Sequence, residues 1–369
     1  MKQATIKDVA EAARCSTTLV SRVMNAPRRE DGSPDCVVNP KTAERIFEAV
    51  RTLGYKPNKA AVSLRKKLKK RIGVILPDLS NQFFAGIAKH FETLAQQNGY
   101  VVLFGSSNDN AEKLSETAEA FIEDGVDGIV ITPGVNCSNA IKRIIDGGTH
   151  VILIVRDLPE IKNVGKILLD SKSATETVLD HLIEQGYRRI DMLSLSHRIP
   201  NVEEREMLYT EYMQQLGLPH KIHHASESNV DLEIIMEQAL RSGTDALYCI
   251  SASLPIRCVL AGKSRGIKFP KDLALTGYDG GYLYNAISPS MTQIEYSKEE
   301  IAKETFNMLM EIIASQDKVP EYKYLKGKFT VGESTTKTST EKSASPKTDA
   351  KDVIRKAISS LEETLRSLD

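Results

Sequence analysis

Five side chains that can hydrogen-bond with nucleic-acid bases lie close together near the start of the chain. They are Thr17, Thr18, Ser21, Arg22 and Asn25. Hydroxyl and amide groups donate and accept hydrogen bonds, and an arginine can make a bidentate contact with guanine. The intervening Val20, Val23 and Met24 recur at helical spacing, which leaves the polar residues on the outer face. The pattern predicts a helix that presents polar groups to base edges in the major groove of DNA.

A second short helix is predicted directly before this one. Its apolar residues follow the i, i+3, i+4, i+7 spacing of one helix face, namely Ile6, Val9, Ala10 and Ala13. Thr5 is the expected N-cap of this helix. After a short break at residues 14–15, Ser16 is expected to cap the helix that carries the polar residues. Two short helices joined by a tight turn indicate a helix-turn-helix.

Charge divides the chain into a basic beginning and an acidic remainder. Residues 1–71 hold 17 Lys and Arg against 7 Asp and Glu, a net charge of +10. The rest of the chain holds 32 basic and 42 acidic residues, so the total charge of zero conceals this asymmetry. Because the basic segment coincides with the helix-turn-helix, we expect a polyanionic partner for that segment only.

A third helix completes the predicted head. After a loop at 26–40, Asn39 and Pro40 are expected to be the N-cap and the first residue of this helix. Its apolar face consists of Ala43, Ile46, Phe47 and Val50. We therefore expect residues 1–57 to form a small all-α DNA-binding head.

The segment after the head is basic. Pro57 interrupts the chain, Asn58 can cap a short helix that extends through Leu64, and a cluster of Lys and Arg follows. Cationic side chains beside a DNA-reading head are suited to phosphate contacts. Residues 58–70 are therefore expected to be a hinge helix and a basic linker.

From residue 71, continuous apolar runs alternate with helical segments. The first runs are IGVILP, YVVLFG, DGIVIT and HVILIV, with helices expected at 82–98, 111–124 and 138–147. A second series is KILLD, RIDMLSL, DALYCI and LALTGYD, and the strands MTQIEY and YKYLKGKFTV come late. Such runs are typical of parallel sheets buried on both faces. We expect a two-lobed α/β core over 71–335, with lobe 1 at 71–156 and 290–318 and lobe 2 at 157–289 and 319–335.

The last part of the sequence is predicted to be a tether and an oligomerisation helix. Residues 336–352 are polar and low in complexity. Residues 353–369 place apolar side chains at alternating intervals of four and three, namely Ile354, Ile358, Leu361, Leu365 and Leu368. This spacing is typical of a coiled-coil seam. The helix is expected to pair with other copies of the chain, which would join homodimers into a tetramer.

These motifs together resemble the LacI/GalR family of bacterial transcription regulators over about residues 4–335. The matching stretches are TIKDVA, VSRVMN, GYKPN, the Ser63-Leu64 pair, IGVILPDLSNQFF, DGIVI, HLIEQGYRRI and TGYDG. The resemblance implies a helix-turn-helix head, a hinge helix and a core like that of periplasmic binding proteins. It implies a repressor whose dimer binds a near-palindromic operator and whose core binds a small effector, a sugar or related metabolite. It implies no cofactor.

The resemblance also assigns DNA contacts to individual residues. Base-reading positions match Thr17, Thr18 and Arg22, and positions that contact the DNA backbone match Thr5, Ser16, Ser21, Asn25 and Tyr55. Leu64 matches the hinge leucine, with Asn58 and Ala61 beside it in the hinge. That leucine would enter the minor groove as an apolar wedge and bend the duplex. Thr5 and Ser16 would also cap helices, and a capped helix N-terminus favours phosphate.

The effector residues implied by the resemblance come from both lobes. Arg205 matches a ligand-binding arginine, Asp279 a late aspartate, and Phe83 and Phe84 aromatic positions of the pocket; Arg156 and Ser251 complete the predicted site. An arginine and an aspartate that face each other across a cleft suit sugar hydroxyls or a polar ring.

This sequence departs from the family pattern in both the core and the head. Val155 stands where many members have an aspartate, and Ser251-Ala252 replaces an Asn-Asp pair, so two hydrogen-bonding positions are lost. Three alternatives follow: a ligand other than an ordinary free sugar, a protein co-regulator, or a repressor that responds to no ligand. In the head, Leu19 replaces a usual threonine, and the loop at 26–40 is longer than usual.

Other classes of protein fit the sequence less well. It contains no GxxxxGK[ST], HExxH or GxSxG motif, which disfavours an enzyme. His220, His223 and His224 lack Cys or carboxylate partners at metal-ligand spacing, so no metal is expected. A periplasmic solute-binding protein would share the lobes but not the head, and no signal peptide is evident. The five cysteines show no CxxC spacing and no long apolar run occurs, so we expect a cytoplasmic protein with free thiols.

Overall fold

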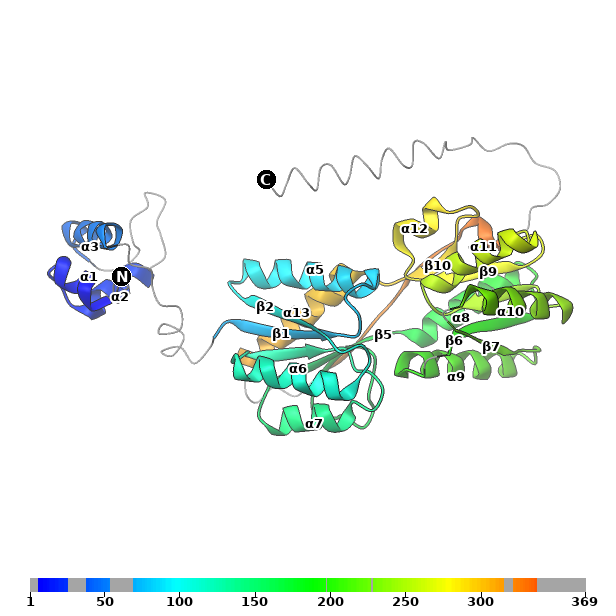
Figure 1. Cartoon of the computed structure of the whole chain (residues 1–369), viewed down its shortest axis with the longest axis horizontal. Coiled ribbons are helices and arrows are strands. Elements are labelled where there is room, and N and C mark those ends of the chain that lie inside the picture. Colours follow the sequence, from blue (N-terminus) through cyan, green and yellow to red (C-terminus); the bar gives the residue numbers. More distant parts are fainter. Residues whose placement is uncertain are drawn as a thin grey trace. The chain divides into compact units, whose positions relative to one another are not determined.

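The chain folds into two compact units, and the division falls between Lys70 and Arg71. The computed structural model describes residues 6–25, 38–53, 69–196, 198–226, 228–314 and 321–336. Figure 1 shows a helical first unit in blue and an α/β second unit in cyan to orange.

The first unit packs three helices around a small apolar core. They are α1 (Ile6–Ala12), α2 (Thr17–Asn25) and α3 (Pro40–Thr52). Val9, Val20, Val23 and Ile46 are completely buried between these helices. Leu19 packs against the same cluster, as expected for a change in helix packing.

The turn between α1 and α2 is a Schellman motif. Arg14 takes the left-handed conformation, with φ 47°. The Cys15 N–H donates to the Ala10 carbonyl at 2.9 Å, and the Arg14 N–H donates to the Glu11 carbonyl at 3.1 Å. These bonds satisfy the last carbonyls of α1 and turn the chain sharply into α2.

Lobe 1 is a six-stranded sheet in the order β11-β5-β4-β3-β1-β2, and its strands run parallel. The strands are β1 (Arg71–Leu76), β2 (Val101–Ser106), β3 (Gly128–Ile131), β4 (Val151–Val155), β5 (Gly165–Leu169) and β11 (Tyr322–Leu325). One face is covered by α5 (Gln82–Gln97) and α13 (Lys298–Ala314), and the other by α6 (Ala111–Glu123) and α7 (Ser138–Asp146). Side chains alternate between these faces, so Ile72 and Val74 pack toward α5 while Ile75 packs toward α6.

Lobe 2 has a second six-stranded sheet in the order β12-β10-β9-β8-β6-β7. Its strands are β6 (Ile190–Leu195), β7 (Ile222–Ala225), β8 (Ala246–Cys249), β9 (Ala274–Tyr278), β10 (Thr292–Glu295) and β12 (Lys328–Thr330), and only β12 is antiparallel to its neighbour. The helices are α8 (Ser171–Glu184) and α9 (Pro200–Gln215) on one face, and α10 (Asn229–Arg241) and α11 (Ser253–Arg265) on the other. Two short helices, α12 (Gly281–Ala286) and η1 (Glu333–Thr335), adjoin the sheet.

The predicted lobe boundaries are wrong for three strands. β5, expected to begin lobe 2, pairs in parallel with β4 and belongs to lobe 1. β11, expected in lobe 2, pairs in parallel with β5 and also belongs to lobe 1. β10, expected in lobe 1, pairs with β9 and belongs to lobe 2. An apolar run predicts a buried strand but carries no information about which sheet the strand joins, because the pairing partners lie elsewhere in the chain.

The chain crosses between the lobes three times, always from the carboxyl end of a strand. The crossings follow β5, β10 and β11. The Asp170 N–H donates to the Leu325 carbonyl at 2.8 Å, and the Tyr296 hydroxyl donates to the Asp170 carbonyl at 3.1 Å. At Gly327, a Cβ atom would lie 2.3 Å from the Ile294 side chain. Only a glycine at this position therefore lets the third crossing lie this close to the second. The three crossings are thus tied together side by side.

Candidate DNA-binding surface and interlobe site

The start of α2 presents hydroxyl groups to solvent. Ser16, Thr17 and Thr18 are all exposed. The Ser16 Oγ accepts a hydrogen bond from the Leu19 N–H at 3.2 Å, which makes Ser16 the N-cap of α2. The remaining N–H groups of the first turn and the Thr17 and Thr18 hydroxyls can therefore bind phosphate oxygens or base edges.

The other predicted DNA-binding residues are only partly described. Ser21, Arg22 and Asn25 lie on the backbone of α2, but their side chains are outside the described part of the chain. Also outside it are Thr5, Tyr55, Asn58, Ala61 and Leu64, and the predicted oligomerisation residues Ile354, Ile358, Leu361, Leu365 and Leu368.

The predicted effector residues lie where the two lobes meet. The crossings leave from carboxyl ends of strands in both sheets, so these ends of the parallel strands face the interlobe boundary. Phe83 and Phe84 begin α5 after β1, Arg156 follows β4, and Ser251 and Asp279 follow β8 and β9. Arg205 comes from the first half of α9. Ligands of open α/β sheets bind at such carboxyl ends.

In lobe 1, Arg156 is held between a carboxylate and an aromatic ring. It is 4% exposed, forms an ion pair with Asp109, and donates to the Pro133 carbonyl at 3.1 Å. Its guanidinium lies 5.7 Å from the centre of the Phe84 ring, which packs edge-on against Phe83.

The residue before Arg156 is strained. Val155 has φ 70°, a conformation that β-branched residues rarely adopt, and the Arg156 N–H donates to the Ile154 carbonyl at 2.7 Å across this γ-turn. The turn directs the chain from β4 into Arg156, and such strain persists only where surrounding structure enforces it.

In lobe 2, Arg205 lies over the ring of Tyr278, with its guanidinium carbon 4.1 Å from the ring centre. Its Nη1 donates to the Ile250 carbonyl at 2.8 Å, and its buried Nε has no hydrogen-bond partner among the described residues. The Tyr278 hydroxyl bonds with the Tyr248 hydroxyl at 2.6 Å, which in turn bonds with Thr175 at 3.0 Å. The hydroxyl groups of Tyr278, Tyr248 and Thr175 therefore already form hydrogen bonds with one another.

Asp279 is the acidic group on this side of the site. Its backbone is left-handed, with φ 51°, and its Oδ1 accepts the Tyr296 N–H at 2.8 Å. Burial raises the pKa of Asp279 to about 6, against the lowering effects of the Tyr296 N–H, Arg205 and Lys298. Near neutral pH a fraction of this carboxyl group is protonated and can donate a hydrogen bond.

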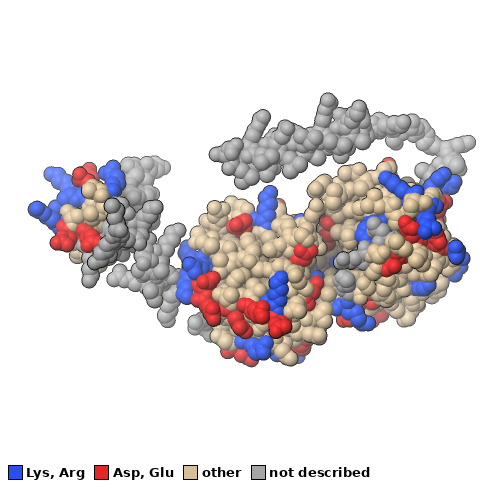
Figure 2. All heavy atoms as spheres, viewed as in Figure 1, with Lys and Arg blue, Asp and Glu red and all other residues tan. Residues whose placement is uncertain are grey.

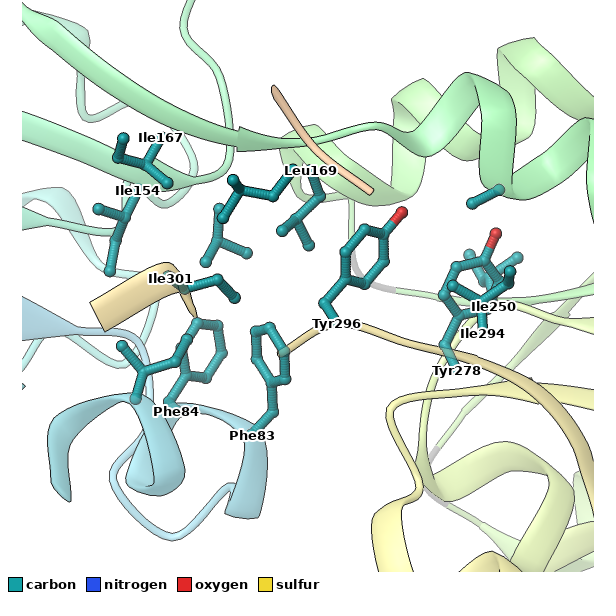
Figure 3. Close-up of a cluster of buried hydrophobic side chains, with 14 of the residues drawn as sticks. Phe83, Phe84, Ile154, Ile167, Leu169, Ile250, Tyr278, Ile294, Tyr296 and Ile301 are labelled. Carbon is teal, nitrogen blue, oxygen red and sulfur yellow. The ribbon is translucent and has the colours of Figure 1, made fainter. Parts of the chain in front are cut away.

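The predicted residues therefore form two groups, with Tyr296 between them. Phe83, Phe84 and Arg156 form the lobe 1 group, and Arg205 and Asp279 the lobe 2 group. Figure 3 shows the Tyr296 ring between Phe83 on one side and Tyr278 on the other, within one cluster of buried side chains that spans both lobes. Ser251 stands apart from these contacts, with its hydroxyl 3.4 Å from that of Ser253.

Sequence reasoning missed several residues of the site. They are Asp109, Thr175, Tyr248, Tyr278 and Tyr296. The sequence could have indicated Tyr278, because it directly precedes Asp279 in the TGYDG turn. No sequence pattern marks Asp109, since its position depends on a loop that reaches Arg156 across the sheet edge.

A surface groove of about 340 Å³ lies elsewhere, between α6 and α7. It is lined in part by Glu112, Glu116, Glu119 and Arg143, and acidic side chains gather over α6 in Figure 2. None of the predicted effector residues lines this groove.

Within the described ranges, no group of three or more His, Cys, Asp or Glu side chains is arranged to hold a metal ion. None of the helices in those ranges is long and apolar enough to cross a membrane.

A helix-turn-helix head followed by a two-lobed core defines a class of DNA-binding regulators. The profile of bacterial regulatory proteins of the lacI family matches residues 5–58, and that of the periplasmic binding protein-like domain matches residues 179–335. The chain is similar to the LacI family of bacterial regulatory proteins, and the relatives it matches are named transcriptional regulators.

Sequence relatives align over most of their length. The chain is 27% identical to the HTH-type transcriptional repressor PurR of Actinobacillus pleuropneumoniae, over 84% of this chain and 91% of the relative. It is 27% identical to catabolite control protein A of Staphylococcus epidermidis, over 79% and 86%.

Solved structures share the fold. The lac repressor dimer bound to operator and the anti-inducer ONPF superposes with a TM-score of 0.77 at 20% identity, over 90% of this chain and 99% of that one. The complex of the transcriptional regulator CelR with cellobiose gives a TM-score of 0.64 at 21% identity, over 90% and 99%.

Proposed function

We propose that this protein is a cytoplasmic, sequence-specific repressor of transcription that binds a near-palindromic operator as a homodimer. A small effector bound between the lobes controls the affinity for DNA. The observation that carries the proposal is the presence, in one chain, of an exposed α2 N-terminus on a basic head and of a buried Arg205 and a half-buried Asp279 at the interlobe boundary.

DNA recognition is proposed to combine base and phosphate contacts. Thr17, Thr18 and Arg22 read base edges, while Ser16, Ser21, Asn25, Thr5 and Tyr55 contact the backbone. Leu64 enters the minor groove between base pairs, with Asn58 and Ala61 beside it. Support comes from the exposed hydroxyls at the start of α2, and from relatives that are named repressors or bound to operator.

Regulation is proposed to act through two lobe arrangements. Phe83, Phe84, Arg156, Arg205, Asp279 and Ser251 would contact the effector from both sides. An effector shifts the equilibrium only by its difference in affinity for the two arrangements. One arrangement would hold the linkers of the dimer close enough for hinge helices to form on DNA. Support comes from the placement of these residues at facing sheet edges, next to the three crossings.

Alanine substitution at the start of α2 tests the proposed DNA contacts. An operator selected in vitro from random duplexes is the probe, and fluorescence anisotropy measures affinity. Thr17→Ala and Thr18→Ala should each weaken specific binding about tenfold to a hundredfold, the usual cost of a lost base contact. Binding to unrelated duplex should change little, because phosphate contacts dominate there.

Thr52→Ala is the matched control, since Thr52 is an exposed threonine at the end of α3. It should leave both affinities unchanged. The proposal is wrong if the full-length protein shows no salt-dependent affinity for any duplex.

A further inference from the structure

Arg205 carries a buried positive charge with which no carboxylate in the described part of the chain forms an ion pair. The residue is 5% exposed, and its Nε is buried without an acceptor. Among the residues that the structure describes, no carboxylate oxygen lies within the 4.0 Å that defines an ion pair with it. Its Nη1 donates instead to the neutral carbonyl of Ile250. Removing an unpaired cation from water is costly, so a fold that keeps one has a reason to do so.

The other buried cations of the core are paired. Arg156, which is 4% exposed, forms an ion pair with Asp109. Lys166, which is 1% exposed, binds Asp157 with its Nζ 2.6 Å from the carboxylate. Three cations therefore share the same degree of burial, and Arg205 alone among these three lacks a carboxylate partner.

Two carboxyl groups that interact electrostatically with Arg205 accept hydrogen bonds from other groups. Asp279 accepts the Tyr296 N–H, and Glu204 accepts the Ser171 hydroxyl at 3.0 Å. Burial raises the pKa of both carboxyl groups, so neither holds a full negative charge as readily as an exposed carboxylate does. Within the described part of the chain, neither carboxyl group forms an ion pair with the Arg205 guanidinium.

The surroundings of Arg205 favour a compact ligand with one charged end. Tyr278 supplies an aromatic face under the guanidinium, and its hydroxyl is engaged by Tyr248. At the matching sheet edge of lobe 1 the chain offers Phe83, Phe84 and Val155. The Nε–H of Arg205, which has no partner among the described residues, suits an anionic oxygen.

We propose that the effector of the interlobe site is a small anion, a carboxylate or a phosphate ester, whose negative group binds the Arg205 guanidinium. This inference rests on the proposed function, because it assigns a ligand class to the same site. The anion supplies the charge that Asp109 and Asp157 supply to Arg156 and Lys166.

Thermal unfolding of the full-length protein tests the ligand class with inorganic phosphate, acetate and glucose as probes. Ionic strength is held constant with chloride, and each probe is titrated through the millimolar range. Phosphate, acetate or both should raise Tm with saturation, and glucose should not. If phosphate saturates at a lower concentration than acetate, the ligand is a phosphate ester; if acetate does, the ligand is a carboxylate. Stabilisation by glucose alone, or by none of the three, overturns the proposal.

Arg205→Gln removes the charge but keeps an N–H donor. This variant should bind the effective anion about tenfold to a hundredfold more weakly, as expected for the loss of hydrogen bonds to a charged group. Arg188→Gln is the matched control: Arg188 also donates to main-chain carbonyls of lobe 2, those of Ile183 and Tyr187, but from an exposed position. An anion effect that survives in Arg205→Gln, or that is lost equally in Arg188→Gln, overturns the assignment to Arg205.

Operator binding, measured on the same samples, separates this inference from the proposed function. If the wild-type protein binds operator but no anion stabilises it, the ligand class is wrong and the repressor assignment stands. If the protein binds no DNA, the proposed function fails whatever the anions do. Should Arg205→Gln not fold, the wild-type comparison of anions with glucose still decides the ligand class.

Discussion

Individual charged residues at the interlobe boundary differ in how they are stabilised. Arg156 has a carboxylate partner, Arg205 has an aromatic ring and a carbonyl, and Asp279 has a backbone N–H. These differences arise from local contacts at each sheet edge. They set the protonation of Asp279, and the positive charge available to a ligand, before any ligand binds.

Asp279 should make the stability of the core depend on pH. Its pKa is about 6 in the folded chain against an ordinary value of 3.8, so the folded state binds this proton more tightly than the unfolded state. The stabilisation is full below about pH 4 and disappears as pH rises through about 6, a loss of up to about 3 kcal/mol. Asp279→Asn keeps an acceptor for the Tyr296 N–H and removes the titration.

Chemical denaturation at pH 4.5 and 7.5 measures this contribution. The difference in unfolding free energy between Asp279→Asn and wild type should shift in favour of the variant at the higher pH. Asp272→Asn is the control, because Asp272 is an exposed carboxylate that also accepts a backbone N–H. Parallel pH profiles for wild type and Asp279→Asn would rule out the raised pKa.

At the scale of elements, the ends of helices carry the proposed chemistry. α2 begins at a serine cap, and α5 begins at Asn81, whose side chain accepts the Phe83 N–H at 3.0 Å. Each cap fixes where its helix starts and hence which side chains occupy the first turn. The positions of Thr17 and Thr18 in one unit, and of Phe83 and Phe84 in the other, follow from these caps.

Substitutions at Ser16 should separate capping from DNA contact. Ser16→Ala removes the cap and should lower the stability of the head by about 1 kcal/mol. Ser16→Asp restores an acceptor for the Leu19 N–H, so stability should recover, but its charge repels phosphate and DNA affinity should remain low. Thermal unfolding of the head signal and DNA anisotropy measure the two effects. If the stability of the head and the affinity for DNA both recover in Ser16→Asp, Ser16 only caps the helix.

For the whole molecule, the three crossings between lobes decide how the core can move. They are held together by the Asp170–Leu325 and Tyr296–Asp170 hydrogen bonds and by the close approach at Gly327. Since all three leave from strand carboxyl ends, a change in lobe orientation acts directly on the residues placed there. An effector bound to these residues, as proposed, would therefore act directly on the orientation of the lobes.

Tyr296→Phe should loosen the connection between the lobes. Loss of the hydroxyl bond to the Asp170 carbonyl should cost about 1 kcal/mol of unfolding free energy. It should also speed hydrogen exchange at the Asp170 N–H, which bonds to Leu325 in the third crossing. Tyr324→Phe is the control, because that tyrosine is 57% exposed on β11. Equal exchange rates at Asp170 in the two variants would exclude the proposed tie.

Deletion of residues 353–369 should change assembly but not recognition. If Ile354, Ile358, Leu361, Leu365 and Leu368 form a seam with other copies, the deletion should lower the mass from tetramer to dimer in light scattering. Operator affinity of a single dimer should be unchanged. An unchanged mass after deletion would refute the seam.

Several features of the fold were predictable from the sequence because they depend on neighbours along the chain. The Asn39-Pro40 start of α3, the serine cap of α2, and helices α5, α6 and α7 follow from local periodicity and capping. The motifs of the head also sufficed to recognise the family. The exposure of Thr17 and Thr18 followed from the burial of Val20 and Val23.

Other features depended on contacts between residues far apart in the chain. Apolar strands have the same pattern in either lobe, so only pairing placed β5 in lobe 1 and β10 in lobe 2. The partner of Arg156 lies 47 residues away at Asp109. The sequence by itself determined that an arginine stands at position 205. Tertiary structure decided that this arginine is buried with no carboxylate partner among the residues that the structure describes, because charge balance in a core depends on which distant groups the fold brings near.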